Sequence, residues 1–329
     1  MSQPPPLSVG LPVYNGEKFL GEAVDSLLGQ TFGDFELIIS DNASTDQTGE
    51  ICREYARQDA RVRYIRQPHN IGLSPNHNFV ADEARGKLFK WAAADDLYGP
   101  GLLRGCVQAL DERPDAVLAH SWTAAVDAAG NVTQAYSYPL KTESASPAER
   151  FRSFLFGCSG MFEVPGSPGN LVRLDHDGIL RACDEYGVIR TRVLRSVAAR
   201  GSYHDPDRIL ITELLLRGPF AIIPDWMYFR RDHDGRAHNS SLQERCAILD
   251  PRRASRLKNP SVRLMGEYVM GYVGAIRRSP VSPADRRECL RQLALWVADH
   301  AGSAVLPRHL QPFVDDLPTG RPRPVTAHG

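Results

Sequence analysis

Residues 89–98 read Phe89-Lys90-Trp91-Ala92-Ala93-Ala94-Asp95-Asp96-Leu97-Tyr98, an apolar run followed by two adjacent carboxylates. The run is short and follows a Gly-Lys turn, which predicts a buried strand. The acidic pair would then lie at the carboxyl end of that strand, the edge at which open α/β sheets bind ligands. Neighbouring carboxylates repel each other unless a cation or donor groups compensate them. The pair is therefore a candidate site for Mg2+ or Mn2+, with a solvated Asp-Asp turn as the alternative.

The chain before this run alternates between short apolar segments and segments with helical periodicity. Strands are predicted at Leu7 to Val13, Phe35 to Ser40, Val62 to Arg66 and Lys87 to Ala92. Helices are predicted at Phe19 to Leu28, Thr48 to Arg57 and Asn76 to Arg85. This rhythm predicts βαβ units and an α/β fold with a mainly parallel sheet.

A parallel sheet would bring the exits of these strands to one edge. Tyr14, Asp41 and the Asp95-Asp96 pair each follow a predicted strand, so we expect them to converge. Such a set suits a nucleoside diphosphate: the aromatic ring would stack on the base, and Asp41 would accept a base N–H. The acidic pair would hold ribose and metal. Taken singly, Tyr14 could instead pack on the next helix, and Asp41 could be an Asx-turn residue.

The second half of the chain has a looser pattern. Strands are predicted at Ala116 to His120, Phe220 to Ile223 and Tyr228 to Phe229, with a hairpin turn at Gly130-Asn131. Helices are predicted at Leu102 to Leu110, Glu149 to Phe156, Ile209 to Leu216, Ser261 to Ile276 and Ala284 to Ala298. Pro165, Gly166, Pro168 and Gly169 mark a loop within the segment 165–186.

Composition excludes several classes of protein. The 329 residues include 39 Lys and Arg and 39 Asp and Glu, so no basic surplus for nucleic-acid binding exists. The six cysteines form no Cys-x-x-Cys pair, which argues against a zinc site or a disulfide framework. No apolar run approaches the roughly 20 residues of a membrane span, and the polar start lacks a signal-peptide core. We therefore expect a cytoplasmic protein.

The segment from Leu7 to Leu103 resembles a family-2 glycosyltransferase with the GT-A fold. The matching motifs are Val13-Tyr14-Asn15-Gly16, Gln30-Thr31-Phe32, Glu36 to Asp46, Asn70-Ile71-Gly72 and Ala94-Asp95-Asp96. The Asn76-His77-Asn78 and Lys90-Trp91 pairs resemble those of actinobacterial members. The resemblance implies a mixed, mainly parallel sheet flanked by helices and followed by a C-terminal helical extension.

The resemblance also implies roles for particular residues. Donor-binding residues would be Pro12, Tyr14, Asn15, Asp41, Asn70, Gly72, His77 and Asp95. Asp96 and His233 would hold the divalent metal, Mn2+ or Mg2+, and Asp207 would be the general base. His77 stands where many members have an arginine, which puts its contact with the donor in question. Pro206-Asp207 stands where many members have Glu-Asp, so only the second acid survives, with Asp205 as the alternative base.

These expectations divide the chain into parts. Residues 1–245 would form the GT-A domain, with a donor half at 7–120 and an acceptor half at 121–245. The resemblance implies that 165–186 is an insertion that related sequences lack, on the surface and bordering the acceptor cleft. Residues 246–317 would form the helical extension, and 318–329 a disordered tail. The apolar helix within 261–278 is expected to be core, with a homodimer contact or a peripheral contact at the inner face of a membrane as alternatives.

The predicted function is inverting, metal-dependent transfer of a sugar from a nucleotide-diphosphate donor, a UDP-sugar by expectation. The acceptor would be a hydroxyl on a glycan, a lipid-linked glycan or a small natural product. Nucleotidyl transfer on a similar fold and non-catalytic sugar-nucleotide binding are the alternatives. A NAD-dependent oxidoreductase is excluded because no G-x-G-x-x-G motif follows the first strand.

Overall fold

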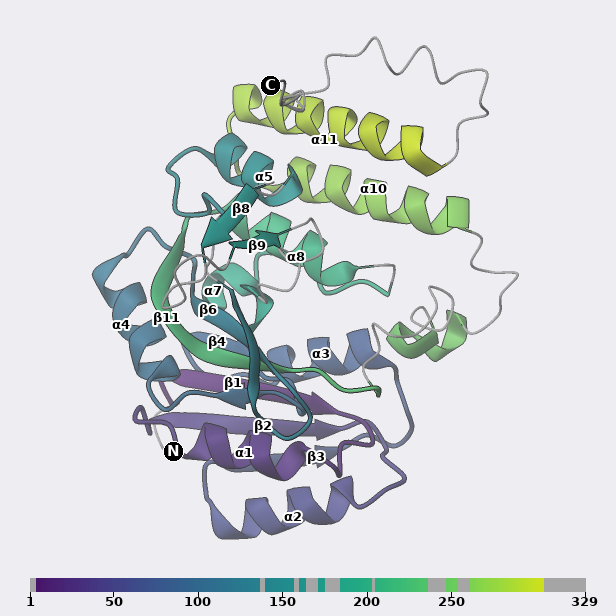
Figure 1. The fold of residues 1–329 in the computed structure, drawn as a ribbon. Coiled ribbons are helices and arrows are strands. Elements are labelled where there is room, and N and C mark those ends of the chain that lie inside the picture. The colour runs from purple at the N-terminus through teal and green to yellow at the C-terminus, as the bar shows by residue number, and fades with distance from the viewer. Residues whose placement is uncertain are drawn as a thin grey trace, which may run out of the picture.

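The computed structural model describes residues 4–136, 140–156, 160–163, 171–174, 184–202, 205–235, 247–253 and 261–304. Its centre is a nine-stranded sheet with the strand order β3-β2-β1-β4-β10-β6-β11-β5, and β7 pairs with β6 (Figure 1). The strands are β1 (Leu7–Val13), β2 (Phe35–Asp41), β3 (Val62–Arg66), β4 (Leu88–Trp91), β5 (Leu97–Tyr98), β6 (Leu118–Val126), β7 (Val132–Tyr136), β10 (Val188–Arg190) and β11 (Phe220–Arg231). A separate hairpin pairs β8 (Gly160–Glu163) with β9 (Leu171–Leu174).

The sheet is mixed and mainly parallel, as the sequence predicts. Strands β3, β2, β1 and β4 run parallel, and β6 runs parallel to β11. Strand β10 is antiparallel to both of its neighbours, β4 and β6, and thereby joins the two parallel halves. The N-terminal half of the chain therefore forms one side of the sheet as a continuous block of βαβ units.

Helices cover both faces of this sheet. They are α1 (Leu20–Leu28), α2 (Thr48–Gln58), α3 (Leu73–Asp82), α4 (Leu102–Glu112), α5 (Pro147–Phe156), α7 (Thr191–Leu194), α8 (Pro206–Leu215), α10 (Ser261–Arg278) and α11 (Pro283–Ala304). Short 3-10 helices are η1 (Asp184–Tyr186) and η3 (Pro251–Arg253). Figure 1 shows α1 and α2 on one side of the sheet, and α10 and α11 stacked beyond the other.

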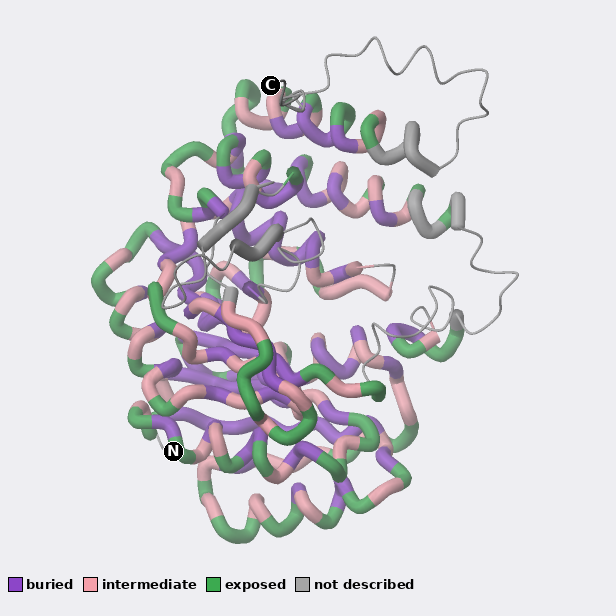
Figure 2. Tube along the Cα trace, viewed as in Figure 1, coloured by how far each residue is buried: buried purple, intermediate pink, exposed green. Residues whose placement is uncertain are grey.

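Two apolar clusters fill the space between these layers. One joins the sheet to α1, α2 and α4, and the other joins it to α3, α5, α8, α10 and α11. Buried residues run along the central strands and into the C-terminal helices (Figure 2). Tyr272, Ala275 and Ile276 of α10 are fully buried, so part of the apolar face of this helix belongs to the core. Within the described ranges, no helix is long and apolar enough to cross a bilayer.

The structure corrects the prediction of two strands at 220–223 and 228–229. A single strand, β11, runs from Phe220 to Arg231 beside β6, with register irregularities on either side of Trp226. Pro224 and Asp225 predict an interruption of the strand. They lie in the irregular part of the pairing with β6, where a strand tolerates proline. The hairpin turn is confirmed, with Gly130 at a φ of 88° between β6 and β7.

Candidate active site

The carboxyl ends of β1 and β2 lie side by side, as predicted. Val13 pairs with Asp41 at the last position of each strand, and Pro12 pairs with Ser40 one residue earlier. The acidic pair joins this edge four residues after β4. A Cβ added to Gly16 would lie 3.8 Å from the Cβ of Ala94, so the approach to Asp95 lies next to the loop that follows β1.

The loop after β1 is locked to the loop after β2. The N–H of Asn15 donates to Ser44 Oγ at 2.9 Å, and Asn15 Oδ1 accepts from the N–H of Thr45 at 2.8 Å. Asn15 has a φ of 50°, in the left-handed region that asparagine tolerates better than most residues. Asn15 is thus a scaffold residue, and the neighbouring Tyr14 side chain remains 48% exposed. That exposure leaves the face of an aromatic ring available at the strand edge.

Asp41 is fully buried and its carboxylate is already hydrogen-bonded. Oδ2 accepts from the Tyr64 hydroxyl at 2.9 Å and from Arg66 Nη1 at 2.5 Å, while Oδ1 accepts from the N–H of Ser44 at 2.7 Å. Tyr64 and Arg66 lie in β3, and the Arg66 side chain is 43% exposed. Sequence reasoning missed both residues, although the correctly predicted end of β3 was the signal that could have found them.

Asn70 and Gly72 form the next part of this edge. Asn70 Oδ1 accepts from Asn42 Nδ2 at 3.0 Å and from the N–H of Gly72 at 2.9 Å. Gly72 has a φ of 95° and is the N-cap residue that precedes α3. A Cβ there would lie 2.6 Å from the carbonyl oxygen of Leu249, so only glycine allows this close approach. Asn70 and Gly72 therefore fix the conformation of the loop that leads into α3.

His77 is buried inside α3. Its Nδ1 donates to the carbonyl of Leu73 at 2.9 Å, and its own carbonyl accepts from Trp91 Nε1 at 3.0 Å. Burial, reinforced by the positive charge of Arg200, lowers the pKa of His77 to about 3. His77 is therefore neutral near pH 7. It does not replace the positive charge of the arginine that the family resemblance leads one to expect there.

The two carboxylates of the acidic pair have different environments. Asp96 is fully buried, and it accepts hydrogen bonds from the Tyr228 hydroxyl and from the Arg231 N–H, the latter at 2.8 Å. Asp95 is 29% exposed, and its Oδ2 lies 3.0 Å from His233 Nε2. The family resemblance implies that Asp95 binds the ribose and that Asp96 binds the metal. In the structure, only the Asp95 side chain of this pair reaches the surface.

The fit of a metal to these residues rests on Asp95 and His233. Across the described ranges, no three His, Cys, Asp or Glu side chains gather as a complete site. A hard cation such as Mg2+ nevertheless needs only one or two protein ligands when phosphates and water supply the others. Asp95 is partly exposed and has the His233 imidazole beside it, so it could supply such a ligand, whereas the Asp96 carboxylate is buried and hydrogen-bonded.

Arg231 fixes the position of this pair. Its side chain is fully buried, and it donates to the Asp95 carbonyl at 2.9 Å and to the Ala128 carbonyl at 2.7 Å. It also pairs with Glu22 of α1 at 2.7 Å, and its guanidinium lies over the ring of Phe19. Sequence analysis did not identify Arg231, because its role depends on contacts with residues far away in the sequence.

The 3-10 helix η1 packs against residues next to the acidic pair. Tyr186 stacks on Tyr228 with ring centroids 5.4 Å apart, and the Tyr186 carbonyl accepts from Lys90 Nζ. Lys90 is fully buried and lies over the rings of Tyr98 and Tyr228. The end of the predicted surface insertion is thus packed inside the site. The rest of that insertion lies outside the described residues, apart from β9.

Asp207 lies in the first turn of α8, half-buried. Pro206 opens the helix, and Asp205 precedes it with a φ of 45°. A carboxylate in the first helical turn is favoured by the helix dipole, so this position stabilises negative charge. Asp207 interacts electrostatically with Glu185 and with Arg200, which places it beside η1. Asp205 occupies the N-cap position outside the first turn.

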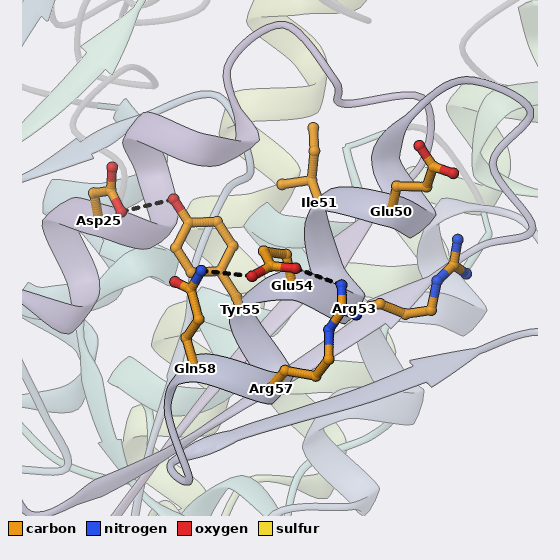
Figure 3. A pocket seen from close by; sticks show the side chains of 8 residues that line it. All are labelled: Asp25, Glu50, Ile51, Arg53, Glu54, Tyr55, Arg57 and Gln58. Atoms are coloured by element: carbon orange, nitrogen blue, oxygen red, sulfur yellow. Dashed lines mark hydrogen bonds and ion pairs between the residues drawn. The ribbon is translucent and has the colours of Figure 1, made fainter.

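A surface hollow lies elsewhere, along α1 and α2 (Figure 3). Its lining includes Tyr55, whose hydroxyl donates to Asp25 at 2.6 Å, and Glu54, which pairs with Arg57. Figure 3 shows the Tyr55 hydroxyl directed at Asp25 and the Arg57 guanidinium directed at Glu54. None of the predicted site residues lines this hollow, so the strand edge remains the candidate active site.

Comparison with known proteins identifies the kind of domain. Residues 8–169 match the family model "Glycosyl transferase family 2". Chondroitin synthase of Escherichia coli is 34% identical to this chain over 158 residues. The matched segment covers 46% of this chain and 22% of that protein. The chain spans less than half the length of the curated relatives it matches.

Two solved structures share the fold. TarS of S. aureus, residues 1–349, superposes with a TM-score of 0.59 at 16% identity over 93% of this chain and 77% of that one. TarS has also been solved with UDP and with UDP-GlcNAc. Mannosyltransferase PcManGT from Pyrobaculum calidifontis, in complex with GDP-Man and Mn2+, superposes with a TM-score of 0.51 at 15% identity over 95% of this chain and 79% of that one.

Proposed function

We propose that this chain moves a sugar from a nucleotide-diphosphate donor to an acceptor hydroxyl with inversion. The premise is that residues 8–169 form a family-2 glycosyltransferase domain. The observation that carries the proposal is the strand edge itself. An exposed Tyr14 ring, the Asp41–Arg66 pair and the exposed Asp95 with His233 lie at the ends of neighbouring strands. Base, ribose and diphosphate have to be bound by groups of this kind.

The donor would lie along this edge, with its base on Tyr14. Arg66 presents a half-exposed guanidinium beside the buried Asp41, so polar contacts to the base or ribose would come from Arg66 and Tyr64 as well as from Asp41. TarS binds UDP and UDP-GlcNAc on the same fold, which supports a UDP-sugar as the donor. The GDP-Man complex of PcManGT supports the wider class of nucleotide sugars.

Asp95 and His233 would hold a divalent metal, and Asp96 would keep them in place. When bound, the metal would neutralise the charge of the departing diphosphate as a Lewis acid. The Mn2+ in the PcManGT complex supports this choice of ion. This revises the expected order of the acidic pair, because Asp96 is committed to Tyr228 and Arg231.

Asp207 would act as the general base. Its carboxylate would take the proton of the acceptor hydroxyl as that oxygen bonds to the anomeric carbon of the sugar. The bond between the anomeric carbon and the diphosphate oxygen breaks in the same step, and the nucleoside diphosphate leaves. Attack from the side opposite the leaving group inverts the configuration. The placement of Asp207 on α8, away from the elements that carry Asp95 and Asp96, supports this division of roles.

A donor panel tests the proposal. The purified chain is incubated with UDP-glucose, UDP-GlcNAc and GDP-mannose, with MnCl2 or with EDTA, and the released nucleotide is quantified by chromatography. We expect Mn2+-dependent release of a nucleoside diphosphate from at least one donor. Release of pyrophosphate from a nucleoside triphosphate would instead indicate nucleotidyl transfer. Thermal stabilisation by a donor without any turnover, with hydroxyl acceptors present, would indicate a binding protein.

A further inference from the structure

Lys90 is a buried cation that the proposed reaction does not use. It lies in β4, the strand that leads to the acidic pair, and its side chain is fully buried. Removing an ammonium from water is costly unless the groups around it compensate its charge. A neutral side chain of similar size would pack here without that cost, so the charge of Lys90 needs an explanation.

Three tyrosines surround the Lys90 ammonium, and we call them the tyrosine cage. Nζ lies 5.1 Å from the ring centroid of Tyr98 and 5.6 Å from that of Tyr228. The carbonyl of Tyr186 accepts a hydrogen bond from Nζ, and the Tyr186 ring stacks on Tyr228 with centroids 5.4 Å apart and planes 18° from parallel. Aromatic faces and a carbonyl oxygen all attract a cation, so the cage compensates the charge of a buried lysine.

Two of these tyrosines also hold the loop that carries the acidic pair. The Tyr98 hydroxyl donates to the Ala93 carbonyl at 2.9 Å, and the Tyr228 hydroxyl donates to the Asp96 carboxylate. In the sequence, Ala93 and Asp96 lie on either side of Asp95. The two hydroxyls therefore fix the loop both before and after the proposed metal ligand.

Arg231 supports the same loop from β11. Its N–H donates to Asp96 Oδ1 at 2.8 Å, and its Nε donates to the Asp95 carbonyl at 2.9 Å. The Asp96 carboxylate thus joins β11 backbone to the Tyr228 hydroxyl. A cation over the face of Tyr228 draws electron density away from that hydroxyl, which makes it a stronger donor to Asp96.

We propose that Lys90 is a positioning residue for the Asp95 carboxylate. Its ammonium holds the rings of Tyr98 and Tyr228 in place. The hydroxyls of these two rings then hold the loop in the conformation in which Asp95 reaches the metal and the donor diphosphate. The inference deepens the proposed function and rests on Asp95 being a metal ligand.

The variant Lys90→Met tests the role of the charge, because it keeps a side chain of similar length without the ammonium. We expect it to weaken Mn2+ binding in the presence of UDP by about 10-fold, as expected for loss of a group that orients a metal ligand. The affinity for UDP without metal should stay near that of the unaltered chain, since Tyr14 and Arg66 follow or end other strands. Donor hydrolysis should recover at saturating Mn2+.

Double-mutant cycles separate positioning from packing. Tyr228→Phe keeps the ring beside Lys90 but removes the hydroxyl that donates to Asp96. Tyr98→Phe likewise removes only the hydroxyl that donates to the Ala93 carbonyl. If Lys90 acts through these hydroxyls, Lys90→Met should weaken Mn2+ binding less in either Phe background than in the unaltered chain. Additive losses in both cycles would overturn the proposal.

The matched control is Arg150→Met. Arg150 is 3% exposed and donates to the carbonyls of Leu215, Ser144 and Ala145, so this variant also removes a buried cation bound to backbone oxygens. Its contacts lie on other elements than the acidic pair. It should lower Tm and leave the Mn2+ affinity unchanged.

The measurements are calorimetric titration of Mn2+ into the UDP-bound chain, Tm, and Mn2+-dependent donor hydrolysis. Weaker Mn2+ binding in Lys90→Met, with UDP affinity retained and Arg150→Met unaffected, supports the proposal. Mn2+ affinity in Lys90→Met equal to that of the unaltered chain overturns it. If Lys90→Met does not fold, Tyr98→Phe decides, because an unchanged Mn2+ affinity there removes the route from the cage to the loop.

Asp95→Asn separates the two levels of the argument. Unchanged Mn2+ affinity in Asp95→Asn removes the metal assignment of the proposed function. Weaker Mn2+ binding in Asp95→Asn, beside an unaltered affinity in Lys90→Met, removes only this inference.

Discussion

His233 Nε2 lies 3.0 Å from Asp95 Oδ2, although 138 residues separate the two in sequence. The N–H of Gly235 donates to His233 Nδ1 at 3.2 Å, so in the neutral imidazole the proton is on Nε2 and points at the carboxylate. The pair joins the loop after β4 to the segment that follows β11. The two side chains therefore lie together before a donor binds. Coordination of a metal by Nε2 would require the imidazole proton to move to Nδ1, which would release the contact with the Gly235 N–H.

The first prediction concerns the assignment of the metal to this pair. Asp95→Asn or His233→Gln should raise the Mn2+ concentration for half-maximal donor turnover by more than about 100-fold, because each removes one of two protein ligands. Folding should be nearly unaffected, since both side chains are partly exposed. Mn2+ titration of donor hydrolysis, with Tm by calorimetry, provides the measurement. An unchanged Mn2+ requirement in both variants would reject the assignment.

Asp96 should behave differently. Asp96→Asn keeps the size of the side chain but replaces a charged acceptor of the Tyr228 hydroxyl and the Arg231 N–H. The loss should lower the free energy of unfolding by about 1–3 kcal/mol. Urea denaturation followed by circular dichroism measures it. Tyr228→Phe, which removes one donor to the same carboxylate, is the matched variant and should also destabilise the fold. Asp96→Asn with unaltered stability and a lost Mn2+ response would return the metal to Asp96.

Tyr14 should contribute to affinity for the nucleotide and little to stability. Tyr14→Ala should weaken UDP binding by roughly 1–3 kcal/mol, the usual contribution of a base stacked on an aromatic ring. Tyr14→Phe keeps the ring and should retain most of the affinity. Calorimetric titration with UDP compares the two variants. Equal affinity in Tyr14→Ala and the unaltered chain would remove the proposed base site.

His77 should make the fold sensitive to acid. Its pKa is about 3 in the folded state and about 6.5 when unfolded, so below pH 6.5 the unfolded chain binds a proton that the folded chain does not. Stability from this residue is complete above pH 6.5 and is lost as pH falls toward 3, by up to about 1.4 kcal/mol per pH unit. His77→Gln should flatten the slope of unfolding free energy between pH 6 and 4.5 by one proton. Parallel slopes for the two proteins would show that His77 is not buried as described.

The C-terminal helices should stabilise the helix that carries Asp207. Arg208 is buried, and it donates to the Tyr272 hydroxyl of α10 at 2.9 Å and to the Phe154 carbonyl at 3.3 Å. Tyr272→Phe removes one acceptor of a buried charge, which should cost about 1–3 kcal/mol. Tyr268→Phe removes the 3.1 Å contact between the two hydroxyls but leaves the Tyr272 acceptor of Arg208 in place, so it should cost less. Thermal unfolding of both variants checks the order, and a larger loss in Tyr268→Phe would contradict it.

The N-terminal block could be predicted closely from sequence. Strand β3 has the predicted bounds Val62–Arg66, and β1 has the predicted bounds Leu7–Val13. These strands are short runs of β-branched and aliphatic residues bounded by turn residues, and such signals are local. Helix α3 begins at Leu73, three residues before the predicted start, because the Gly72 turn leads directly into it.

The candidate site was predicted in outline and revised in detail. Tyr14 and Asp41 lie at adjacent strand ends because β1 and β2 are parallel neighbours in the sheet. The pattern could not distinguish Asp95 from Asp96, because burial of one carboxylate depends on Tyr228 and Arg231 from β11.

The sequence by itself therefore determined the βαβ rhythm, the edge at which the N-terminal strands end and the resemblance to family-2 glycosyltransferases. Tertiary structure alone decided which carboxylate is buried, that β11 is one strand, and that Arg200 pairs with Glu185. The physical reason is the range of the interactions. Periodicity and turn chemistry act over a few neighbouring residues, whereas the environment of a charge depends on every element packed around it.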